Sequence, residues 1–265
     1  MMVYNIPAAL FRAFPDRPLI VRAAAAAQLR AAFGDAVPDG VAFLQLTALT
    51  GDLAPLADWG DGLAVDLVMT DPAIELPLLY RCTPLLARHP VRVTIPWLPG
   101  LARAVKLAVS LGFPVRLVGP QPSAAALEEA RQALDLFLHN PTVAQPVEPF
   151  HGLLGGLLHA TPVDLWDLLE RDPAQTRILD ARAEVLPDQG PASVTVFRET
   201  LRAAGAECCA CPWFASCGGY FKWPRIDFSC DGVKQLFADL DAAAAELRQG
   251  LAAYAAERDG SGDGA

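Results

Sequence analysis

The sequence predicts an α/β protein whose core is a parallel β-sheet, either open or closed into a partial (β/α) barrel. Short apolar runs alternate with amphipathic helical patterns between residues 19 and 138, and the links between them are short. This alternation is typical of βαβ units, which place consecutive strands parallel to one another. Apolar residues make up 53% of the 265 residues, which is enough to bury a large core.

The expected strands are Val3–Ile6, Leu19–Val21, Val41–Leu46, Ala64–Met69, Val91–Pro96 and Val115–Val118. The helices expected between them are Ala23–Phe33, Ile74–Arg88, Leu101–Leu111 and Ser123–Leu138. Pro84 lies inside the second of these helices, where a proline removes a backbone hydrogen bond and clashes with the preceding turn. We therefore expect that helix to be kinked or interrupted.

From residue 141 the pattern changes and the expected elements become shorter. They are two helices, Gly152–His159 and Pro162–Leu169, a hairpin or two isolated strands, Ile178–Leu179 and Val194–Phe197, and a long Ala-rich helix, Val233–Glu257. Thr161 is the expected cap of the second helix. The apolar stripe of the long helix predicts that it docks on the α/β body. The expected organisation is an α/β domain over residues 1–200, a cysteine-rich module with the long helix over 201–258, and a disordered tail over 259–265.

Five of the six cysteines fall between residues 208 and 230. Four of them form a candidate ligand set, Cys208-x2-Cys211-x5-Cys217-x12-Cys230. Two thiolates separated by two residues can bind one ion from a tight turn, and two more can complete a four-sulfur shell. Such sites hold either an iron–sulfur cluster or a structural zinc ion. Cys209 could replace Cys208 as a ligand, although a free thiol is the favoured interpretation, and Cys82 is interpreted as a buried apolar residue.

The third cysteine of the set is followed by Gly218-Gly219-Tyr220-Phe221-Lys222-Trp223-Pro224, and the fourth precedes the Ala-rich helix. The stretch from Glu207 to Phe237 resembles the SPASM domain, the C-terminal extension of radical SAM peptide maturases. The resemblance implies that the four cysteines hold an auxiliary 4Fe–4S cluster. SPASM domains often carry a further cysteine four positions after the third one, and Phe221 stands there in this sequence. The resemblance therefore implies one cluster.

The α/β portion resembles, more loosely, the partial barrel of radical SAM enzymes. In that family a Cys-x3-Cys-x2-Cys loop after the first strand holds the cluster that binds and cleaves S-adenosylmethionine. This sequence has no such loop, because Cys82 is the only cysteine before the C-terminal module. The resemblance then implies a truncated or degenerate member, without a S-adenosylmethionine cluster and without S-adenosylmethionine cleavage of its own.

Composition narrows the classes of partner. The net charge of −9 argues against nucleic acid as the main partner, because phosphate binding needs clustered lysine and arginine. No apolar run reaches the length of a membrane span, and the first residues lack the pattern of a secretory signal. A cytoplasmic location is therefore expected. In a reducing cytosol, crowded thiols bind metal more often than they form disulfides.

Several other residues are weaker candidates for a site. Asp66 and Asp71 flank the end of an expected strand, and Trp97 follows another, at the edge where α/β sheets and barrels bind ligands. Glu148 and His151 could face one cleft from a helix start, although capping and a buried histidine are the favoured interpretations.

Aromatic and basic residues accompany the cysteines. Tyr220, Phe221 and Trp223 are expected to pack around the metal and exclude water. Lys222 and Lys234 could offset the negative charge of a four-thiolate cluster, or could be ordinary surface lysines.

These features predict an iron–sulfur accessory protein in the maturation of a ribosomally synthesised peptide. The family resemblance alone implies the peptide role, and it points to a peptide substrate or a modifying-enzyme partner. The chain would act on that partner by capturing the peptide or by relaying electrons. The alternative is a zinc-stapled binding or scaffold protein without a redox role. A third hypothesis is an enzyme of unrelated chemistry that uses the mouth of the α/β domain. The identity of the metal discriminates between the first two.

Overall fold

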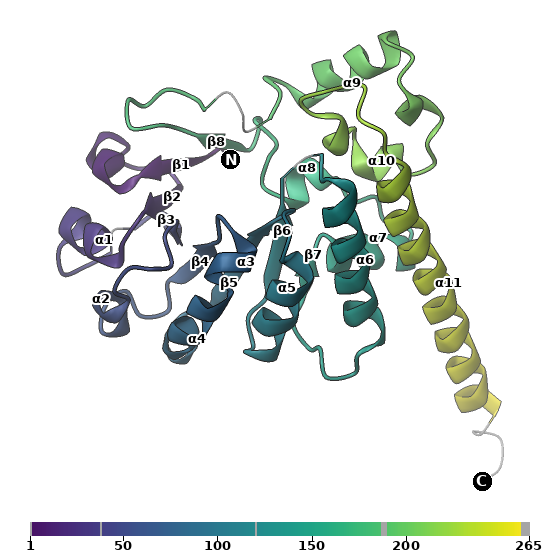
Figure 1. The fold of residues 1–265 in the computed structure, drawn as a ribbon, viewed down its shortest axis with the longest axis horizontal. Coiled ribbons are helices and arrows are strands. Elements are labelled where there is room, and N and C mark those ends of the chain that lie inside the picture. Colours follow the sequence, from purple (N-terminus) through teal and green to yellow (C-terminus); the bar gives the residue numbers. More distant parts are fainter. Residues whose placement is uncertain (1, 38, 120, 187–189, 261–265) are drawn as a thin grey trace.

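The computed structural model describes residues 2–37, 39–119, 121–186 and 190–260, and a sheet of eight parallel strands forms its centre. The strand order is β7-β6-β5-β4-β3-β2-β1-β8, so each strand from β1 to β7 lies beside its neighbours in sequence. The last strand, β8, pairs in parallel with the free edge of β1. The sheet curls into a half-barrel flanked by the connecting helices (Figure 1). The predicted partial barrel of βαβ units is confirmed at this level.

The strands are β1 Val3–Pro7, β2 Leu19–Ala23, β3 Val41–Leu46, β4 Ala64–Val68, β5 Val91–Pro96, β6 Val115–Val118, β7 Val147–Glu148 and β8 Thr176–Ile178. The six strands expected before residue 120 are confirmed, with ends that differ by no more than two residues. The short β7 was not predicted, because two residues are too few to show a periodic pattern.

The α-helices are α1 Ala26–Phe33, α2 Ala54–Ala57, α3 Pro72–Glu75, α4 Leu79–Cys82, α5 Leu101–Ser110, α6 Ala124–His139, α7 Phe150–Leu158, α8 Leu165–Leu168, α9 Val194–Ala203, α10 Phe214–Cys217 and α11 Asp231–Gly260. The 3-10 helices are η1 Ala8–Ala13, η2 Leu76–Leu78, η3 Thr83–Ala87, η5 Glu207–Ala210 and η6 Tyr220–Lys222. The expected interruption of the helix after β4 is confirmed, because that segment is divided into α3, η2, α4 and η3. Ser123 caps α6 by accepting a hydrogen bond from Ala126 N at 3.2 Å, as predicted.

Two local predictions in the C-terminal half are wrong. The segment beginning at Val194 is the helix α9 rather than a strand, and its buried residues Val194, Phe197 and Leu201 share one helical face. Four residues were too short a window to separate a helical from an alternating period. The helix α8 is capped by Asp164, which accepts from Trp166 N at 3.1 Å, and not by Thr161.

The module formed by α9, η5, α10 and η6 lies at one end of the half-barrel (Figure 1). It meets the sheet near the carboxyl ends of β5 and β6, where Gly119 N donates to the Tyr220 hydroxyl at 3.4 Å. The helix α11 leaves the module, packs beside α7 and α6, and then extends beyond the body. It runs to Gly260, two residues into the tail predicted to be disordered, and residues 261–265 of that tail lie outside the described part. Within the described ranges, no helix has the length and apolar character needed to cross a membrane.

Candidate metal centre

The four candidate ligands come from separate parts of the module and line one small cavity. Cys208 lies in η5, Cys211 follows it, Cys217 ends α10 and Cys230 precedes α11. The first pair is held in a turn in which Cys211 N donates to the carbonyl of Cys208 at 3.1 Å. All four are free thiols, three of them buried and Cys211 half-buried. The fold therefore brings together residues that are up to 22 positions apart in the sequence.

The other two cysteines take no part in this cavity. Cys209 is exposed, and its sulfur lies 3.6 Å from the carbonyl oxygen of Leu201. Cys82 is buried in α4, and its sulfur lies 3.5 Å from the carbonyl oxygen of Leu78. Their placement agrees with the favoured interpretations of a free thiol and a buried apolar residue.

The backbone turns sharply around the sulfur of Cys217. Gly218 and Gly219 have φ angles of 57° and 79°, which residues with a Cβ atom rarely adopt. This turn directs the backbone N–H groups of Gly219, Tyr220 and Phe221 toward the Cys217 sulfur. Donors of this kind stabilise a thiolate over a thiol, and consecutive N–H groups form an anion-binding nest. The turn at the glycine pair therefore offsets part of the effect of burial on the Cys217 thiol.

Burial favours the neutral form of the thiols. It raises the pKa of Cys217 to about 11 even though the three N–H donors act in the opposite direction. It raises the pKa of Cys230 to about 12, where the charge of Lys222 opposes the effect and the neighbouring thiols Cys217 and Cys208 strengthen it. A metal binds thiolates, so it must displace these protons, and its affinity depends on pH.

Two lysines and one glutamate complete the polar wall of the cavity. Lys222 is only 3% exposed, and its Nζ donates to Glu207 Oε1 at 2.7 Å and to the carbonyl of Phe228. Lys234 Nζ donates to the other oxygen of Glu207. Hydrogen bonds from the two lysines lower the pKa of Glu207 to about 2, so its carboxylate is charged. The three groups together carry one positive charge, which offsets part of the negative charge of a four-thiolate site.

The apolar wall of the cavity consists of Trp213, Phe214, Val233 and Phe237. The rings of Trp213 and Phe237 stack with their centroids 5.8 Å apart. None of these residues is a candidate in the sequence: Trp213 and Phe214 lie within the cysteine loop, and Phe237 lies in the long Ala-rich helix at the end of the SPASM-like stretch. They exclude water from one side of the thiols.

Two of the three aromatic residues expected around the metal, Tyr220 and Phe221, hold the module against the half-barrel instead. The ring centroid of Phe221 lies 5.9 Å from that of Trp97, and the centroid of Tyr220 lies 5.0 Å from that of Trp166. Trp223 packs on Phe197 at 5.5 Å and lines a different cavity. The expectation that these three residues surround the thiols is therefore wrong. The rings of Tyr220 and Phe221 orient the module relative to the half-barrel, whereas Trp223 packs within the module.

The donor set has the chemistry of a four-sulfur metal site, and all four thiols line one cavity, but they do not stand in ligand geometry. Four sulfurs around one zinc ion lie about 3.8 Å from one another, as tetrahedral geometry with Zn–S bonds of about 2.3 Å requires. Within the described residues, no three His, Cys, Asp or Glu side chains are grouped closely enough to hold one metal ion. The cavity itself has a volume of about 20 Å³, so a four-iron cluster requires the side chains to move outward. Binding of either a zinc ion or a 4Fe–4S cluster therefore requires the cysteine rotamers or the cysteine loop to adjust.

The weaker candidates do not assemble into one site. Asp71 caps α3 by accepting from Ala73 N at 2.9 Å. Glu148 Oε2 accepts from Gly152 N at 2.9 Å in the first turn of α7, which supports its interpretation as a cap. His151 is exposed, so the interpretation of a buried histidine is wrong. Trp97 is buried, and no acceptor among the described residues binds its indole N–H.

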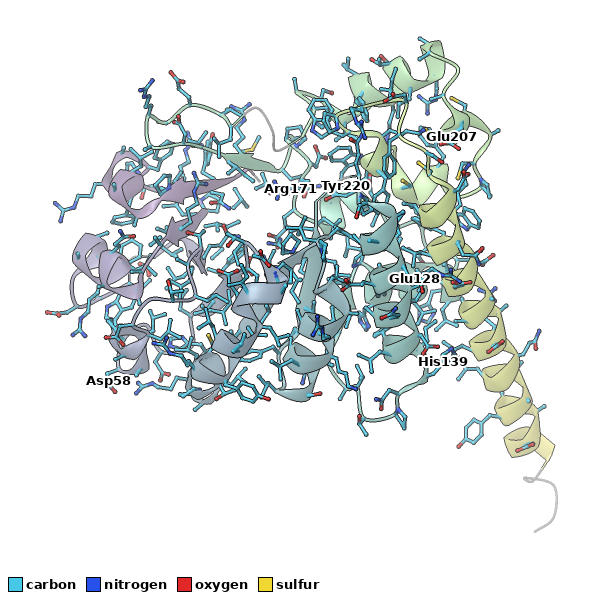
Figure 2. All side chains as sticks on the ribbon, in the orientation of Figure 1. Asp58, Glu128, His139, Arg171, Glu207 and Tyr220 are labelled. Carbon is cyan, nitrogen blue, oxygen red and sulfur yellow. The ribbon has the colours of Figure 1, made fainter. Side chains whose placement is uncertain are left out.

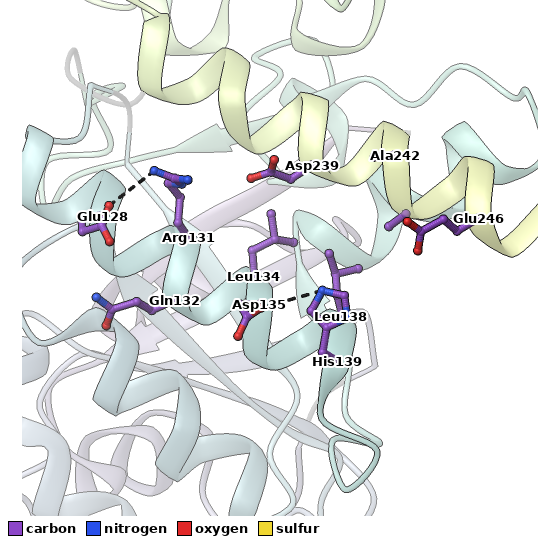
Figure 3. Close-up of a pocket in the computed structure, with 11 residues that line it drawn as sticks. Glu128, Arg131, Gln132, Leu134, Asp135, Leu138, His139, Asp239, Ala242 and Glu246 are labelled. Atoms are coloured by element: carbon purple, nitrogen blue, oxygen red, sulfur yellow. Dashed lines mark ion pairs between the residues drawn. The ribbon is translucent and has the colours of Figure 1, made fainter.

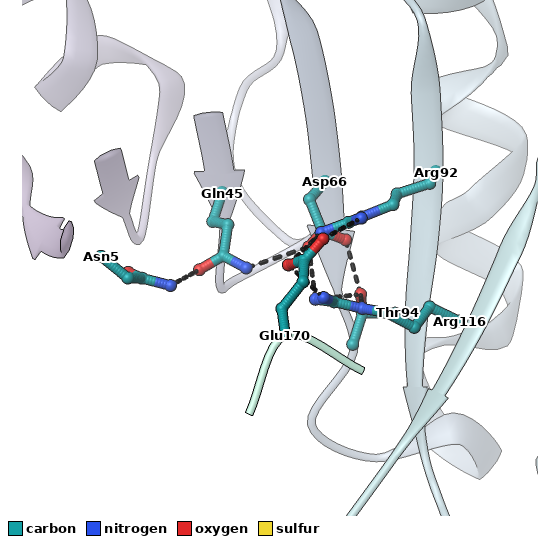
Figure 4. Close-up of polar contacts among 7 residues, drawn as sticks. All are labelled: Asn5, Gln45, Asp66, Arg92, Thr94, Arg116 and Glu170. Atoms are coloured by element: carbon teal, nitrogen blue, oxygen red, sulfur yellow. Dashed lines mark hydrogen bonds and ion pairs between the residues drawn. The ribbon is translucent and has the colours of Figure 1, made fainter. Parts of the chain in front are cut away.

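Asp66 lies at the centre of a polar network inside the half-barrel (Figure 4). Its Oδ1 accepts from Thr94 Oγ1 at 2.6 Å. Its Oδ2 accepts from Gln45 Nε2 at 2.9 Å, Arg116 Nη2 at 2.9 Å and Arg92 Nη2 at 3.1 Å. Burial alone would raise the pKa of Asp66, but the two arginines outweigh that effect and hold it below its ordinary value.

Glu170, in the segment after α8, closes this network from outside the sheet (Figure 4). It accepts two hydrogen bonds from Arg92, at 2.7 and 2.8 Å, and another from Arg116. Two arginines thus balance two carboxylates. Arg92, Arg116 and Glu170 are not among the residues that the sequence singles out, although the alternation Val91-Arg92-Val93-Thr94 indicates a polar face.

A groove of about 490 Å³ lies between α6 and α11 (Figure 3). Four of its lining residues form two ion pairs, Arg131 with Glu128 at 3.6 Å and His139 with Asp135 at 3.8 Å. These side chains are well exposed, so each pair contributes little to stability. We interpret the groove as a solvated seam where the two helices diverge.

No family model matches the chain, and no curated protein matches it. A hypothesis about function therefore depends on the cysteine cavity and on the resemblance of the cysteine spacing to the SPASM motif.

Proposed function

We propose that this chain binds one 4Fe–4S cluster on Cys208, Cys211, Cys217 and Cys230 and serves as an accessory protein in the maturation of a ribosomally synthesised peptide. The observation that carries the metal part is the convergence of these four thiols on one cavity. The N–H nest at Cys217 and the lysine pair at Glu207 support it, because both favour a negatively charged sulfur site.

The residues of the module have separable roles in this proposal. The four cysteines hold the cluster, and the nest stabilises the charge on Cys217. Trp213 and Phe237 keep water from the site, which is one of the factors that set the potential of such a centre. When bound, the cluster supplies one-electron transfer. The peptide part of the proposal comes from the SPASM-like spacing, whose family acts on peptides, and it covers peptide capture as well as electron relay to a modifying enzyme.

The test of the metal site is production and purification of the full chain without oxygen, followed by iron, sulfide and zinc analysis. We expect about four irons and four sulfides per chain and a broad visible absorption that dithionite bleaches. Cys217→Ser should lose most of the iron. Cys209→Ser is the matched control and should keep it, since this thiol points away from the cavity.

One zinc per chain without visible absorption would contradict the cluster and favour the zinc-stapled alternative. Full iron content in Cys217→Ser would contradict the assigned ligand set. The peptide part is tested separately, by photo-crosslinking the tagged chain in its native cells and identifying the products by mass spectrometry. We expect a short ribosomal peptide or its modifying enzyme, and recovery of neither would contradict this part.

A further inference from the structure

The loop that carries Cys217 is bonded to two neighbouring helices through one carbonyl group, that of Gly218. The indole N–H of Trp166, in α8, donates to this carbonyl oxygen at 3.1 Å. Arg198, in α9, donates to the same oxygen from Nε at 3.5 Å. Trp166 is only 1% exposed, so its hydrogen bond is shielded from water. Tyr220, whose ring centroid is 5.0 Å from that of Trp166, marks this place in Figure 2. Two donors from separate helices thus hold the residue that follows a candidate ligand.

Asp164 orients both donors. Its Oδ1 caps α8 by accepting from Trp166 N at 3.1 Å, and its Oδ2 accepts from Arg198 Nη2 at 2.5 Å. The guanidinium of Arg198 lies against Gly218, where a Cβ atom would stand only 2.2 Å from Nη2. Glycine at this position therefore lets the arginine approach the backbone, so that both donors reach one carbonyl.

The carbonyl that they bind belongs to the peptide group between Gly218 and Gly219. This peptide is trans, so its C=O and N–H point in opposite directions, and a fixed carbonyl also fixes the direction of the Gly219 N–H. That N–H faces the sulfur of Cys217. Glycine populates more backbone conformations than other residues. A turn made of two glycines therefore keeps one conformation only where bonds from outside the turn hold it.

The other three candidate ligands are held by bonds that start and end near the cavity. Cys211 N donates to the carbonyl of Cys208 at 3.1 Å, and Cys230 N donates to Glu207 Oε1 at 3.0 Å. Cys208 and Glu207 share η5, and Cys230 directly precedes α11. The bond from Trp166 instead crosses from α8, which follows the first seven strands of the half-barrel, to the ligand loop.

We propose that Trp166 is a positioning residue for the candidate metal centre: its indole N–H holds the Gly218 carbonyl and so keeps the Cys217 sulfur directed into the cavity. This role deepens the proposed function and rests on it, because Cys217 is assigned there as a ligand. The adjustment that metal binding requires then falls on the other three cysteines. The role is the same for a zinc ion and for a 4Fe–4S cluster, since it concerns the backbone beside one ligand.

The test compares Trp166→Phe with Trp59→Phe in the full chain. Phenylalanine keeps an aromatic ring and removes the indole N–H. Trp59 is the matched control, because it is also buried and its indole N–H also donates to a glycine carbonyl, that of Gly34, at 3.0 Å. It lies between α2 and β4, away from the module. The two variants should therefore shift the urea midpoint by similar amounts and differ at the cysteine loop.

The first readout is alkylation of Cys217 by iodoacetamide in folded protein from which metal has been removed, followed by peptide mapping. Cys217 is buried, so it reacts only when its loop opens. We expect it to react about fivefold faster in Trp166→Phe than in wild type or Trp59→Phe, the effect of losing about one net hydrogen bond. The rate at Cys230 should stay unchanged. Equal rates at Cys217 in the two variants would overturn the role of Trp166.

The second readout is release of the metal that elemental analysis finds, iron or zinc, to an excess of a chromogenic chelator. We expect release from Trp166→Phe to be about fivefold faster than from Trp59→Phe. Arg198→Gln removes the second donor without altering the Trp166 ring. It should act in the same direction by a smaller factor, because its bond to Gly218 is longer.

The two readouts distinguish this role from the metal site itself. Faster alkylation of Cys217 in Trp166→Phe, in samples that never contain metal, would contradict the proposed function and support the hold of Trp166 on the loop. Metal-loaded protein in which alkylation and release are the same in every variant would contradict only the role of Trp166.

Discussion

The interior of the half-barrel and the cavity of the cysteine module satisfy their polar groups in different ways. Inside the half-barrel, Asp66 and Glu170 are matched by Arg92 and Arg116, so charge and hydrogen bonds balance within the protein. In the module, the thiols are kept neutral by burial, and the charged wall is positive. The first arrangement is suited to holding a fold together. The second is suited to receiving a cation and becoming negatively charged.

Among substitutions that affect one region and not the other, Arg116→Met is expected to reduce the free energy of unfolding the most. Arg116 is buried and binds Asp66, Thr94 and Glu170, so its loss leaves Asp66 buried with less compensation. Breaking such a buried pair costs about 3–5 kcal/mol, which urea unfolding can measure. Arg88→Met is the control, because its ion pairs with Asp58 and Asp61 are exposed, and it should cost no more than about 1 kcal/mol.

The iron content per folded chain should be the same in Arg116→Met as in wild type, because the network lies outside the module. A loss of iron at full folding would show that the half-barrel interior and the cysteine cavity are coupled.

A smaller effect, with a defined pH dependence, is expected for Glu170→Gln. Burial raises the pKa of Glu170, but the hydrogen bond from Arg92 and the charges of both arginines outweigh it and lower the pKa below its ordinary value of 4.5. The unfolded chain therefore takes up the proton first. The stabilisation from this carboxylate is fully present above about pH 4.5 and is lost as the pH falls through the lower folded-state pKa.

Unfolding free energies of wild type and Glu170→Gln should differ by about 1.5–3 kcal/mol near neutral pH, the range for hydrogen bonds to charged groups. The difference should shrink steadily below pH 4.5. A difference that stays constant down to pH 3 would mean that the ionisation of Glu170 is not its source.

The smallest of these effects is expected in the module, for Lys222→Met. This buried lysine brings positive charge to the cysteine cavity, and its removal makes the addition of an electron to a bound cluster less favourable. We expect a midpoint potential lower by tens of millivolts, where about 59 mV corresponds to about 1.4 kcal/mol for one electron. Lys106→Met on the exposed side of α5 is the control and should leave the potential unchanged. A higher potential in Lys222→Met would contradict this role of the lysine.

The sequence by itself determined the local structure where the pattern was long and regular. The strands before residue 120 and the helices α5 and α6 followed from apolar periodicity and from the cap at Ser123. The spacing of four cysteines within 23 residues likewise selected the side chains that line one cavity. These features depend on neighbouring residues, so they can be read along the chain.

The tertiary structure decided what depends on residues distant in sequence. Asp66 and Glu170 are 104 positions apart in the chain, and only the curvature of the sheet places both beside the same two arginines. For the same reason the sequence predicts Phe221 beside the metal, whereas in the structure its ring packs on Trp97. Four residues do not define a period, so the sequence did not indicate helix α9, whereas its ten residues bury one face, that of Val194, Phe197 and Leu201. The pattern of neighbouring residues determines the helices and strands. The contacts inside the fold depend on side chains that are remote in sequence, because a buried charge or ring is stable only beside partners that the tertiary structure supplies.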